Sequence, residues 1–444
     1  MTFDILIKNC TILTMSRRDE IIHGGIIGIK DGIIADVSTG GDIQSMDAGE
    51  VIDAEGSLVM PGLVNTHTHV PMVCFRGLAD DLPLMEWLNN HIFPVERKFI
   101  SRDMVYDGAM LAIAEMILSG TTTFCDGYFY ESSVGRAAVD AGMRIVASQG
   151  FIDFPTPDGQ DPSNNVRIAE TFIEKWTDVS PLVTPSLVCH SAYTCSPRTL
   201  MAIKDVARRY GVAYQIHLAE TREEAAMIER LYGETPVRHL DKLGVLDDAT
   251  IPAHCVWVDD EEIGILADKG VRVSHNPESN MKLGAGVAPA PKMIDRGVVV
   301  GLGTDGAASN NDLDMFGEMA TAAKLHKATL LDPTVMDART VIRMATIEGA
   351  RVLGLENRIG SIEKGKTADL IIIDVNRPHL TPLYNCYSHV VYAASGSDVR
   401  TSIIQGAIVM KDRILRTMNL SDVMDRVRKI ADRVKAFSQG GAAS

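Results

Sequence analysis

The chain has 444 residues, of which 46% are hydrophobic and 23% charged, as is typical of a globular protein. Its 43 basic and 58 acidic residues give a net charge of −15, which repels nucleic-acid phosphates and disfavours a polynucleotide partner. No apolar run reaches the roughly 20 residues that cross a bilayer, the N-terminal residues do not resemble an export signal, and the seven cysteines contain no C-x-x-C pair. We therefore expect a cytoplasmic protein with reduced thiols and no membrane partner.

Short β-strands are predicted at both ends of the chain. Runs rich in Ile and Val cover residues 5–15, 25–30, 33–38, 51–59, 368–375 and 401–410. Asp31-Gly32 is a typical hairpin turn, and Gly406 interrupts the last run. Each set looks too short to bury a core alone, so we expect both ends to pair into one small β-domain.

Strands and helices alternate between these two segments. Helical spacing is seen, for example, over residues 104–118 and 342–353. Eight apolar runs end at His67, Asp126, Phe151, His190, His217, His254, His275 and Asp305. This alternation predicts an α/β fold with a parallel sheet, and eight strands favour a (β/α)8 TIM barrel. The alternative is an open doubly wound sheet, but no G-x-G-x-x-G loop follows the first strand.

The predicted elements divide the chain into domains. Residues 1–60 and 361–415 are the two parts of a composite β-sandwich domain, and residues 61–360 form the barrel. Residues 416–444 are a C-terminal helix and tail, because residues 421–437 have amphipathic spacing.

Candidate metal ligands stand at the predicted strand ends, which converge on one mouth of a barrel. His67 and His69 lie two residues apart on the first strand and share a face, while His217 ends the fifth strand and Asp305 the eighth. Three imidazoles and one carboxylate suit Zn²⁺ and leave room for a water. The fourth strand ends in His190 and not in a lysine that could bridge two metals, so we expect one zinc per chain.

Two further residues are candidates for proton transfer. Glu220 lies three residues after His217 and could pass protons between the water and the substrate. Its alternative role is a solvated glutamate at the start of the acidic helix, where we place Glu223 and Glu224. His254 could orient the water or take its proton, or it could merely support the site.

Several motifs resemble those of the amidohydrolase superfamily. They are PGLVNTHTH at residues 61–69, HLAE at 217–220, AHC at 253–255 and GTD at 303–305. Other segments are similar to the methylthioadenosine/S-adenosylhomocysteine deaminase group: EWL at 86–88, FPVE at 93–96, HSAYTCSP at 190–197, SHNP at 274–277, SNMKL at 279–283 and NNDLDM at 310–315. The resemblance covers nearly the whole chain and is more specific for the superfamily than for the substrate.

The resemblance implies a zinc-dependent hydrolytic deaminase of an adenosine-type nucleoside. Methylthioadenosine, S-adenosylhomocysteine, 5'-deoxyadenosine and adenosine are the implied substrates, and the enzyme could be a homo-oligomer. Glu96 would bond the ribose hydroxyls, and His190 would contact the substrate near its sugar. Glu220 would bond a ring nitrogen of the purine, and Asp305 would be both ligand and proton shuttle. Without the resemblance, Glu96 would be read as a surface partner of a neighbouring basic residue.

The chain departs from the family pattern after the third strand. Some members carry an arginine there that reaches the amino-acid tail of S-adenosylhomocysteine, whereas this chain has Gln149. Arg167 could substitute for that arginine. Enzymes that act on guanine, pterins or s-triazines resemble the chain in the metal motifs and are the nearest alternatives. A non-catalytic scaffold is a further alternative, but such a relative would lose ligands that are present here.

Overall fold

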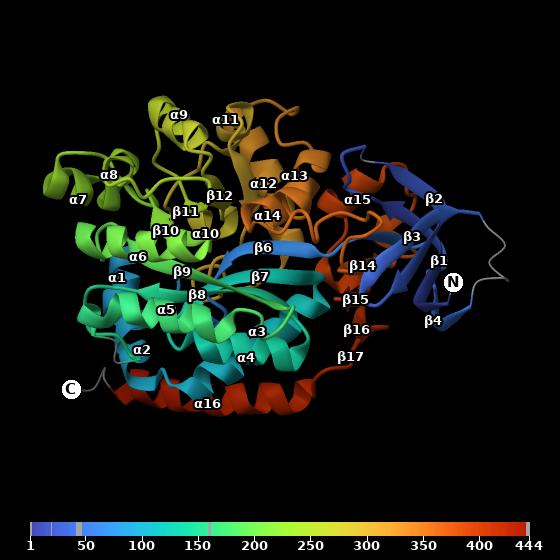
Figure 1. The fold of residues 1–444 in the computed structure, drawn as a ribbon, viewed down its shortest axis with the longest axis horizontal. Helices are drawn as coiled ribbons and strands as arrows, with labels where there is room; N and C mark the ends of the chain where they lie inside the picture. The colour runs from blue at the N-terminus through green and yellow to red at the C-terminus, as the bar shows by residue number, and fades with distance from the viewer. Residues whose placement is uncertain (1, 19, 41–46, 159–160, 441–444) are drawn as a thin grey trace.

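The centre of the molecule is a sheet of eight parallel strands (Figure 1). The computed structural model describes residues 2–18, 20–40, 47–158 and 161–440. In chain order the strands are β6 (Leu63–Thr68), β7 (Thr121–Tyr128), β8 (Arg144–Phe151), β9 (Val183–Ser191), β10 (Tyr214–Leu218), β11 (Thr250–His254), β12 (Arg272–His275) and β13 (Val299–Leu302). The first and last strands meet where the Asp305 N–H donates to the His67 carbonyl at 2.9 Å. The predicted α/β barrel is therefore confirmed.

Helices follow the barrel strands, and most of them cover the outside of the sheet (Figure 1). They are α3 (Arg102–Leu118), α4 (Glu131–Ala141), α5 (Asn165–Trp176), α6 (Pro197–Tyr210), α7 (Arg222–Tyr232), α8 (Pro236–Lys242), α9 (Asp260–Asp268), α10 (Pro277–Lys282), α11 (Ala290–Asp295), α12 (Met315–Leu330), α13 (Ala338–Met344) and α14 (Ile347–Val352). Among the described residues, no helix is both long enough and apolar enough to cross a membrane.

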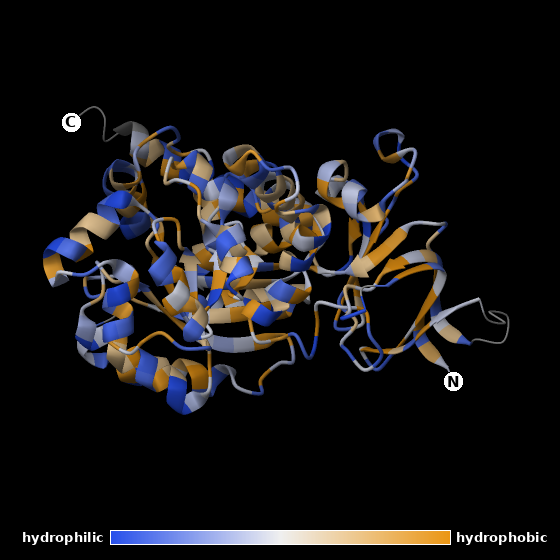
Figure 2. Cartoon of the chain, turned by 90° about the horizontal axis from the view of Figure 1, so that it is seen from above, coloured by the Kyte–Doolittle hydropathy of each residue, from blue (hydrophilic) through white to orange (hydrophobic). Residues whose placement is uncertain are grey.

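Both ends of the chain form one mixed sheet of nine strands beside the barrel (Figure 2). Its strands are β1 (Phe3–Leu13), β2 (Ile21–Lys30), β3 (Ile33–Thr39), β4 (Ala48–Asp53), β5 (Leu58–Pro61), β14 (Leu370–Ile373), β15 (Val399–Ile404), β16 (Ala407–Lys411) and β17 (Ile414–Leu415). The two ends meet where β5 pairs antiparallel with β14. Arg144 of β8 ties this sheet to the barrel through a buried ion pair with Asp369 at 2.6 Å. The prediction of a shared terminal β-domain is confirmed.

Two predicted elements are each divided in the structure. Residues 51–59 belong to β4 and β5, separated by a turn in which Gly56 adopts a φ of +84°. Residues 342–353 fall in α13 and α14, which are separated at Ala345 and Thr346. The Ala345 carbonyl accepts a hydrogen bond from the N–H of Val64 in the barrel at 2.8 Å. In a continuous helix this carbonyl would instead accept an N–H of the next helical turn.

A segment between β6 and α3 covers the C-terminal mouth of the barrel. It contains α1 (Leu84–Glu86), the π-helical turn η3 (Trp87–Ile92) and α2 (Phe93–Phe99). The C-terminal helix α16 (Leu420–Gly440) lies against α3, where Arg426 pairs with Asp107 at 2.6 Å (Figure 1). Residues 441–444, the end of the predicted tail, lie outside the described residues.

Candidate active site

A cavity opens at the C-terminal ends of the barrel strands, where the sequence predicts the site. One end of this cavity is polar and is lined by His69, His190, His217, Glu220, His254 and Asp305. The wall formed by the covering segment is largely apolar, with Leu84, Trp87, Leu88, Ile92 and Phe93, and it also presents Glu96. The cavity thus combines a cluster of titratable groups with a surface suited to a flat, largely apolar ligand.

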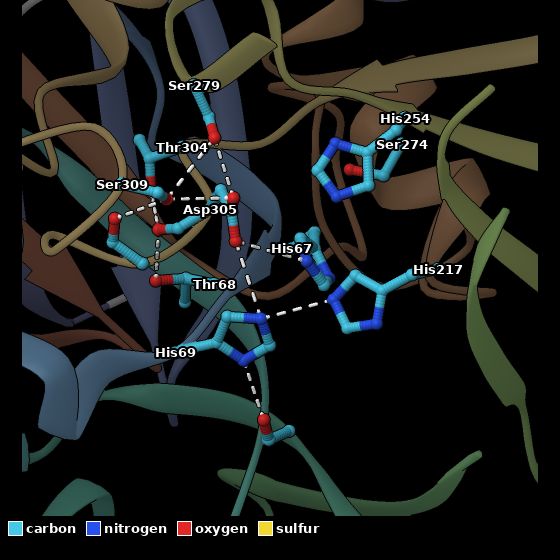
Figure 3. Close-up of polar contacts among 12 residues, drawn as sticks. His67, Thr68, His69, His217, His254, Ser274, Ser279, Thr304, Asp305 and Ser309 are labelled. Carbon is cyan, nitrogen blue, oxygen red and sulfur yellow. Dashed lines mark hydrogen bonds and ion pairs between the residues drawn. The ribbon is translucent and has the colours of Figure 1, made fainter. Parts of the chain in front are cut away.

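The four predicted metal ligands lie together in the polar end (Figure 3). The His69 Nε2 atom is 3.2 Å from the His217 Nε2 atom. The Asp305 Oδ1 atom is 3.5 Å from the His67 Nε2 atom and 3.4 Å from the His69 Nε2 atom. Tetrahedral zinc with Zn–N distances of about 2.0–2.1 Å separates its ligand atoms by about 3.3 Å, so these spacings match a shared ion.

The protonation of the imidazoles also favours a cation. The His69 Nδ1 atom faces the Gly127 carbonyl at 2.7 Å, and the His217 Nδ1 atom faces the His190 carbonyl at 2.7 Å. A carbonyl oxygen only accepts, so each Nδ1 carries the proton and each neutral ring has its lone pair on Nε2. The His67 Nε2 atom is buried and has no hydrogen-bond partner among the residues that the structure describes. The two lone pairs and this unpartnered nitrogen converge, as fits a bound metal ion.

Burial keeps two of these imidazoles neutral. It lowers the pKa of His67 to about 4, and it lowers the pKa of His217 well below the usual range with the help of neighbouring imidazoles. For Asp305, burial alone would raise the pKa, but the His67 imidazole, whose Nε2 atom lies 3.5 Å from Oδ1, and the nearby imidazoles of His69 and His254 outweigh it and hold the net pKa well below the usual range. Neutral imidazoles and an ionised carboxylate are the forms that bind zinc.

Hydrogen bonds fix the Asp305 carboxylate. Its Oδ2 atom accepts the hydroxyl of Ser279 at 2.7 Å and that of Ser309 at 2.9 Å, which leaves Oδ1 directed at the imidazoles (Figure 3). Asp305 adopts a φ of +61° and His254 a φ of +74°. A left-handed backbone at residues other than glycine costs about 1–3 kcal/mol and is concentrated at functional sites.

Glu220 and His254 lie next to each other in the polar end. The His254 Nε2 atom is 4.0 Å from the Glu220 Oε2 atom, and the His254 Nδ1 atom bonds to the Asn280 Oδ1 atom at 2.9 Å. Burial raises the pKa of the Glu220 carboxyl. Burial lowers the pKa of His254, but Glu220 and Asp305 more than offset this and the net pKa is raised. Both groups are thus shifted toward retaining a proton.

The expectation that Glu224 is a solvated residue of the acidic helix is wrong. Its side chain is only 5% exposed. Its carboxylate accepts the N–H of Ala219 at 3.0 Å and that of Glu220 at 2.8 Å, and it thereby holds the loop that carries Glu220. The same expectation is met for Glu223, which is exposed.

Glu96 and His190 also line the cavity. Glu96 is 5% exposed and accepts a hydrogen bond from the Tyr128 hydroxyl, so it is not a surface partner of Arg97 or Lys98. The His190 Nδ1 atom is 3.0 Å from the Thr194 hydroxyl. Burial raises the pKa of Glu96 to about 7 and lowers that of His190 to about 4. Sequence reasoning missed Tyr128, because its partner is 32 residues away and no motif links the two.

Gln149 is not brought into this cavity. Together with Arg167 it lines a neighbouring pocket. Gly150 and Phe151, the next two residues of β8, do line the cavity. No lysine or arginine is found among the described residues that line the cavity.

Known proteins share both the sequence and the fold. The model of the Amidohydrolase family matches residues 58–409. A 5-methylthioadenosine/S-adenosylhomocysteine deaminase of Syntrophobacter fumaroxidans is 50% identical over 433 residues, which cover 97% of this chain and 98% of that protein. A 5'-deoxyadenosine deaminase of Methanosarcina mazei is 44% identical over 434 residues, 98% of this chain and 99% of that protein. The crystal structure of an adenosine deaminase from Xanthomonas campestris with bound Zn superimposes with a TM-score of 0.96 at 36% identity, covering 98% of this chain and 99% of that one.

Proposed function

The chain belongs to the amidohydrolase family, and we propose that it is a zinc-dependent deaminase of adenosine-type nucleosides. The products are ammonia and the inosine analogue. One observation carries the proposal: a single cavity is lined by three of the four predicted ligands, His69, His217 and Asp305, together with Glu220 and the buried Glu96. The names of the relatives point to methylthioadenosine, S-adenosylhomocysteine, 5'-deoxyadenosine or adenosine as the substrate.

Zinc is the proposed cofactor, with one ion per chain held by His67, His69, His217 and Asp305. When bound, zinc lowers the pKa of a coordinated water toward about 7 and so supplies a nucleophile at neutral pH. A carboxylated lysine that could bridge a second ion is not available at the end of β9, where His190 stands. The seven cysteines are all buried free thiols, which supports a reducing compartment such as the cytoplasm.

Protein side chains move the protons in the proposed reaction. Glu220 donates a proton to N1 of the adenine ring while C6 is attacked, and its raised pKa favours the protonated form. His254 accepts the proton of the attacking water through Nε2, because Asn280 occupies its Nδ1. Together with Asp305 it returns this proton to the amine, which leaves as ammonia, and the proton that remains on the C6 hydroxyl restores the Glu220 carboxyl as the 6-oxo product forms. Glu224 and Asn280 keep the two proton carriers in position.

Release of ammonia from a panel of compounds tests the proposal. Adenosine, 5'-deoxyadenosine, methylthioadenosine and S-adenosylhomocysteine represent the proposed class, while guanine, a pterin and melamine represent the alternative substrates. We expect ammonia only from the nucleosides, because the proposed role of Glu96, which lines the cavity, is to bind a ribose. Turnover of guanine or melamine without turnover of a nucleoside would refute the proposal. A protein that neither binds zinc nor releases ammonia from any compound would be a scaffold.

The protonation of Glu96 should govern nucleoside affinity. With a pKa of about 7, its carboxyl is mostly neutral below that pH and mostly ionised above it. An ionised carboxylate makes stronger hydrogen bonds to the ribose hydroxyls. We therefore expect KM for a nucleoside to fall about fivefold as the pH rises through 7, the effect of about 1 kcal/mol. The Glu96→Gln variant cannot ionise and should lack this dependence, whereas equal pH dependence in both proteins would exclude Glu96 as its cause.

The 5' substituent should determine the ranking of substrates. The covering segment that carries Glu96 also presents Leu84, Trp87 and Leu88, and no lysine or arginine is among the described residues that line the cavity. The amino-acid tail of S-adenosylhomocysteine would therefore lack a charge-assisted hydrogen bond to a basic side chain, which is worth about 1.5–3 kcal/mol. We expect kcat/KM for methylthioadenosine and 5'-deoxyadenosine to exceed that for S-adenosylhomocysteine by about ten- to a hundredfold. This preference depends on the apolar wall, since Gln149 lies in the neighbouring pocket. A tenfold preference for S-adenosylhomocysteine would show that a cation such as Arg167 reaches the tail.

A further inference from the structure

The segment that covers the cavity has little regular structure where it leaves the barrel. Between Gly77 and Pro83 the described backbone contains no helix or strand, and α1 is a single short turn. This stretch precedes the apolar residues of the cavity wall and Glu96. Contacts with the rest of the barrel must therefore hold it over the cavity.

Lys282, the last residue of α10, makes such a contact. Its Nζ atom donates to the Asp80 Oδ1 atom at 2.6 Å, to the Asn311 Oδ1 atom at 2.5 Å and to the Ala308 carbonyl at 3.3 Å. The Asn311 amide also reaches the Asp80 Oδ2 atom at 3.4 Å. One ammonium group thus uses all three of its donors to join the covering segment, α10 and the loop after β13.

Both barrel segments joined by Lys282 reach the active site. Ser279 of α10 and Ser309 of the loop after β13 both donate to the Asp305 carboxylate. Leu283, the residue after Lys282, lines the cavity. Asp80 belongs to the covering segment and lies 202 residues from Lys282 in the chain. The contact therefore links the cover to parts of the barrel that are already fixed at the site.

We propose that Lys282 is a positioning residue that fastens the segment of residues 77–92 over the cavity and thereby sets the affinity for the nucleoside. This inference rests on the proposed deaminase function. The Lys282 and Asp80 side chains are 23% and 34% exposed, so the pair is partly shielded from water. The strength of such a pair depends on how well its hydrogen-bond geometry is held. Lys282 does not line the cavity, so it acts through the cover and not on the reacting atoms.

The Lys282→Met variant keeps an unbranched apolar stem and removes the ammonium group. We expect KM for methylthioadenosine to rise about tenfold, the fold-change for losing one charge-assisted hydrogen bond. We expect kcat to change by less than about twofold and the zinc content to stay the same, because the ligands and Glu220 are untouched. Lys282→Arg should recover part of the affinity. The control is Lys292→Met, which removes another lysine–aspartate pair, with Asp260 at 2.8 Å on α9, and should leave KM unchanged.

Hydrogen–deuterium exchange tests the cover without relying on catalysis. Peptides that span residues 77–92 should exchange faster in Lys282→Met and in Asp80→Asn than in the wild type or in Lys292→Met. Unchanged exchange and unchanged KM in both variants would overturn the proposal, as would loss of zinc from Lys282→Met with KM unchanged. If the wild type releases ammonia from no nucleoside, the proposed function fails, and the exchange rates alone then decide whether Lys282 fastens the cover.

Discussion

His69→Ala should lose the bound zinc and the deaminase activity together. The His69 Nε2 atom lies close to both the His217 Nε2 atom and the Asp305 Oδ1 atom. The substitution therefore removes one of the four proposed zinc ligands. Loss of an outer hydrogen-bond partner already lowers metal affinity by about 10–100-fold, and loss of a direct ligand should lower it further. Elemental analysis of the purified variant and an ammonia assay measure the two effects on one preparation.

The matched control for this experiment is His239→Ala. His239 is also buried, but it stacks on Tyr232 at a ring distance of 4.0 Å and does not line the cavity. This variant should keep about one zinc per chain, even if its stability falls. A His69→Ala protein that retains zinc at the wild-type level would contradict the ligand assignment. Two tightly bound metals in the wild type would contradict the single ion.

The sequence contained enough information for the barrel and for the grouping of the site residues. Each barrel strand is a short apolar run, and in a closed parallel sheet all strand ends face one mouth. His67, His217 and Asp305 are far apart in the chain, yet this topology alone brings them together. The same reasoning failed for Gln149, which lines a different pocket although Gly150 and Phe151 of the same strand line the cavity.

Residues that support the site could not be derived in the same way. The bonds of Tyr128 to Glu96 and of Ser309 to Asp305 depend on how loops fold over the mouth, which no local pattern encodes. Glu224 did leave a signal: Thr221 and Glu224 have the spacing of a helix capping box, in which the glutamate turns back toward the backbone before the helix. Glu224 bonds to the N–H groups of Ala219 and Glu220, just before the helix cap.

Tertiary contacts also decided where helices and strands end. Residues 342–353 have a continuous helical pattern, but the Ala345 carbonyl bonds to Val64 of β6 and the helix stops there. Gly349 then packs against the same strand, where an added Cβ would lie 3.1 Å from the Val64 Cβ atom. The periodicity of the sequence shows which side of a helix is apolar. It does not show which helix carbonyl will accept a hydrogen bond from a neighbouring strand.

Glu220→Gln should keep its zinc and lose at least about a hundredfold in kcat, the usual size of a general acid–base contribution. The amide has nearly the same shape as the carboxyl, and Glu224 would still hold the backbone N–H of residue 220. Glutamine can hydrogen-bond the purine but cannot deliver a proton to N1. Because shape and hydrogen bonding are preserved, KM for the nucleoside should change much less than kcat.

Glu223→Gln provides the comparison, since it makes the same chemical change three residues farther along, on an exposed side chain in the first turn of α7. It should retain wild-type kcat. If both variants turned over at the wild-type rate, Glu220 would not be the proton donor, and His254, 4.0 Å away, would be the next candidate to protonate the ring. If Glu220→Gln lost zinc as well as activity, the carboxyl would act on the metal site itself. A slow variant with full zinc, beside a normal Glu223→Gln, is the result that only proton donation by Glu220 predicts.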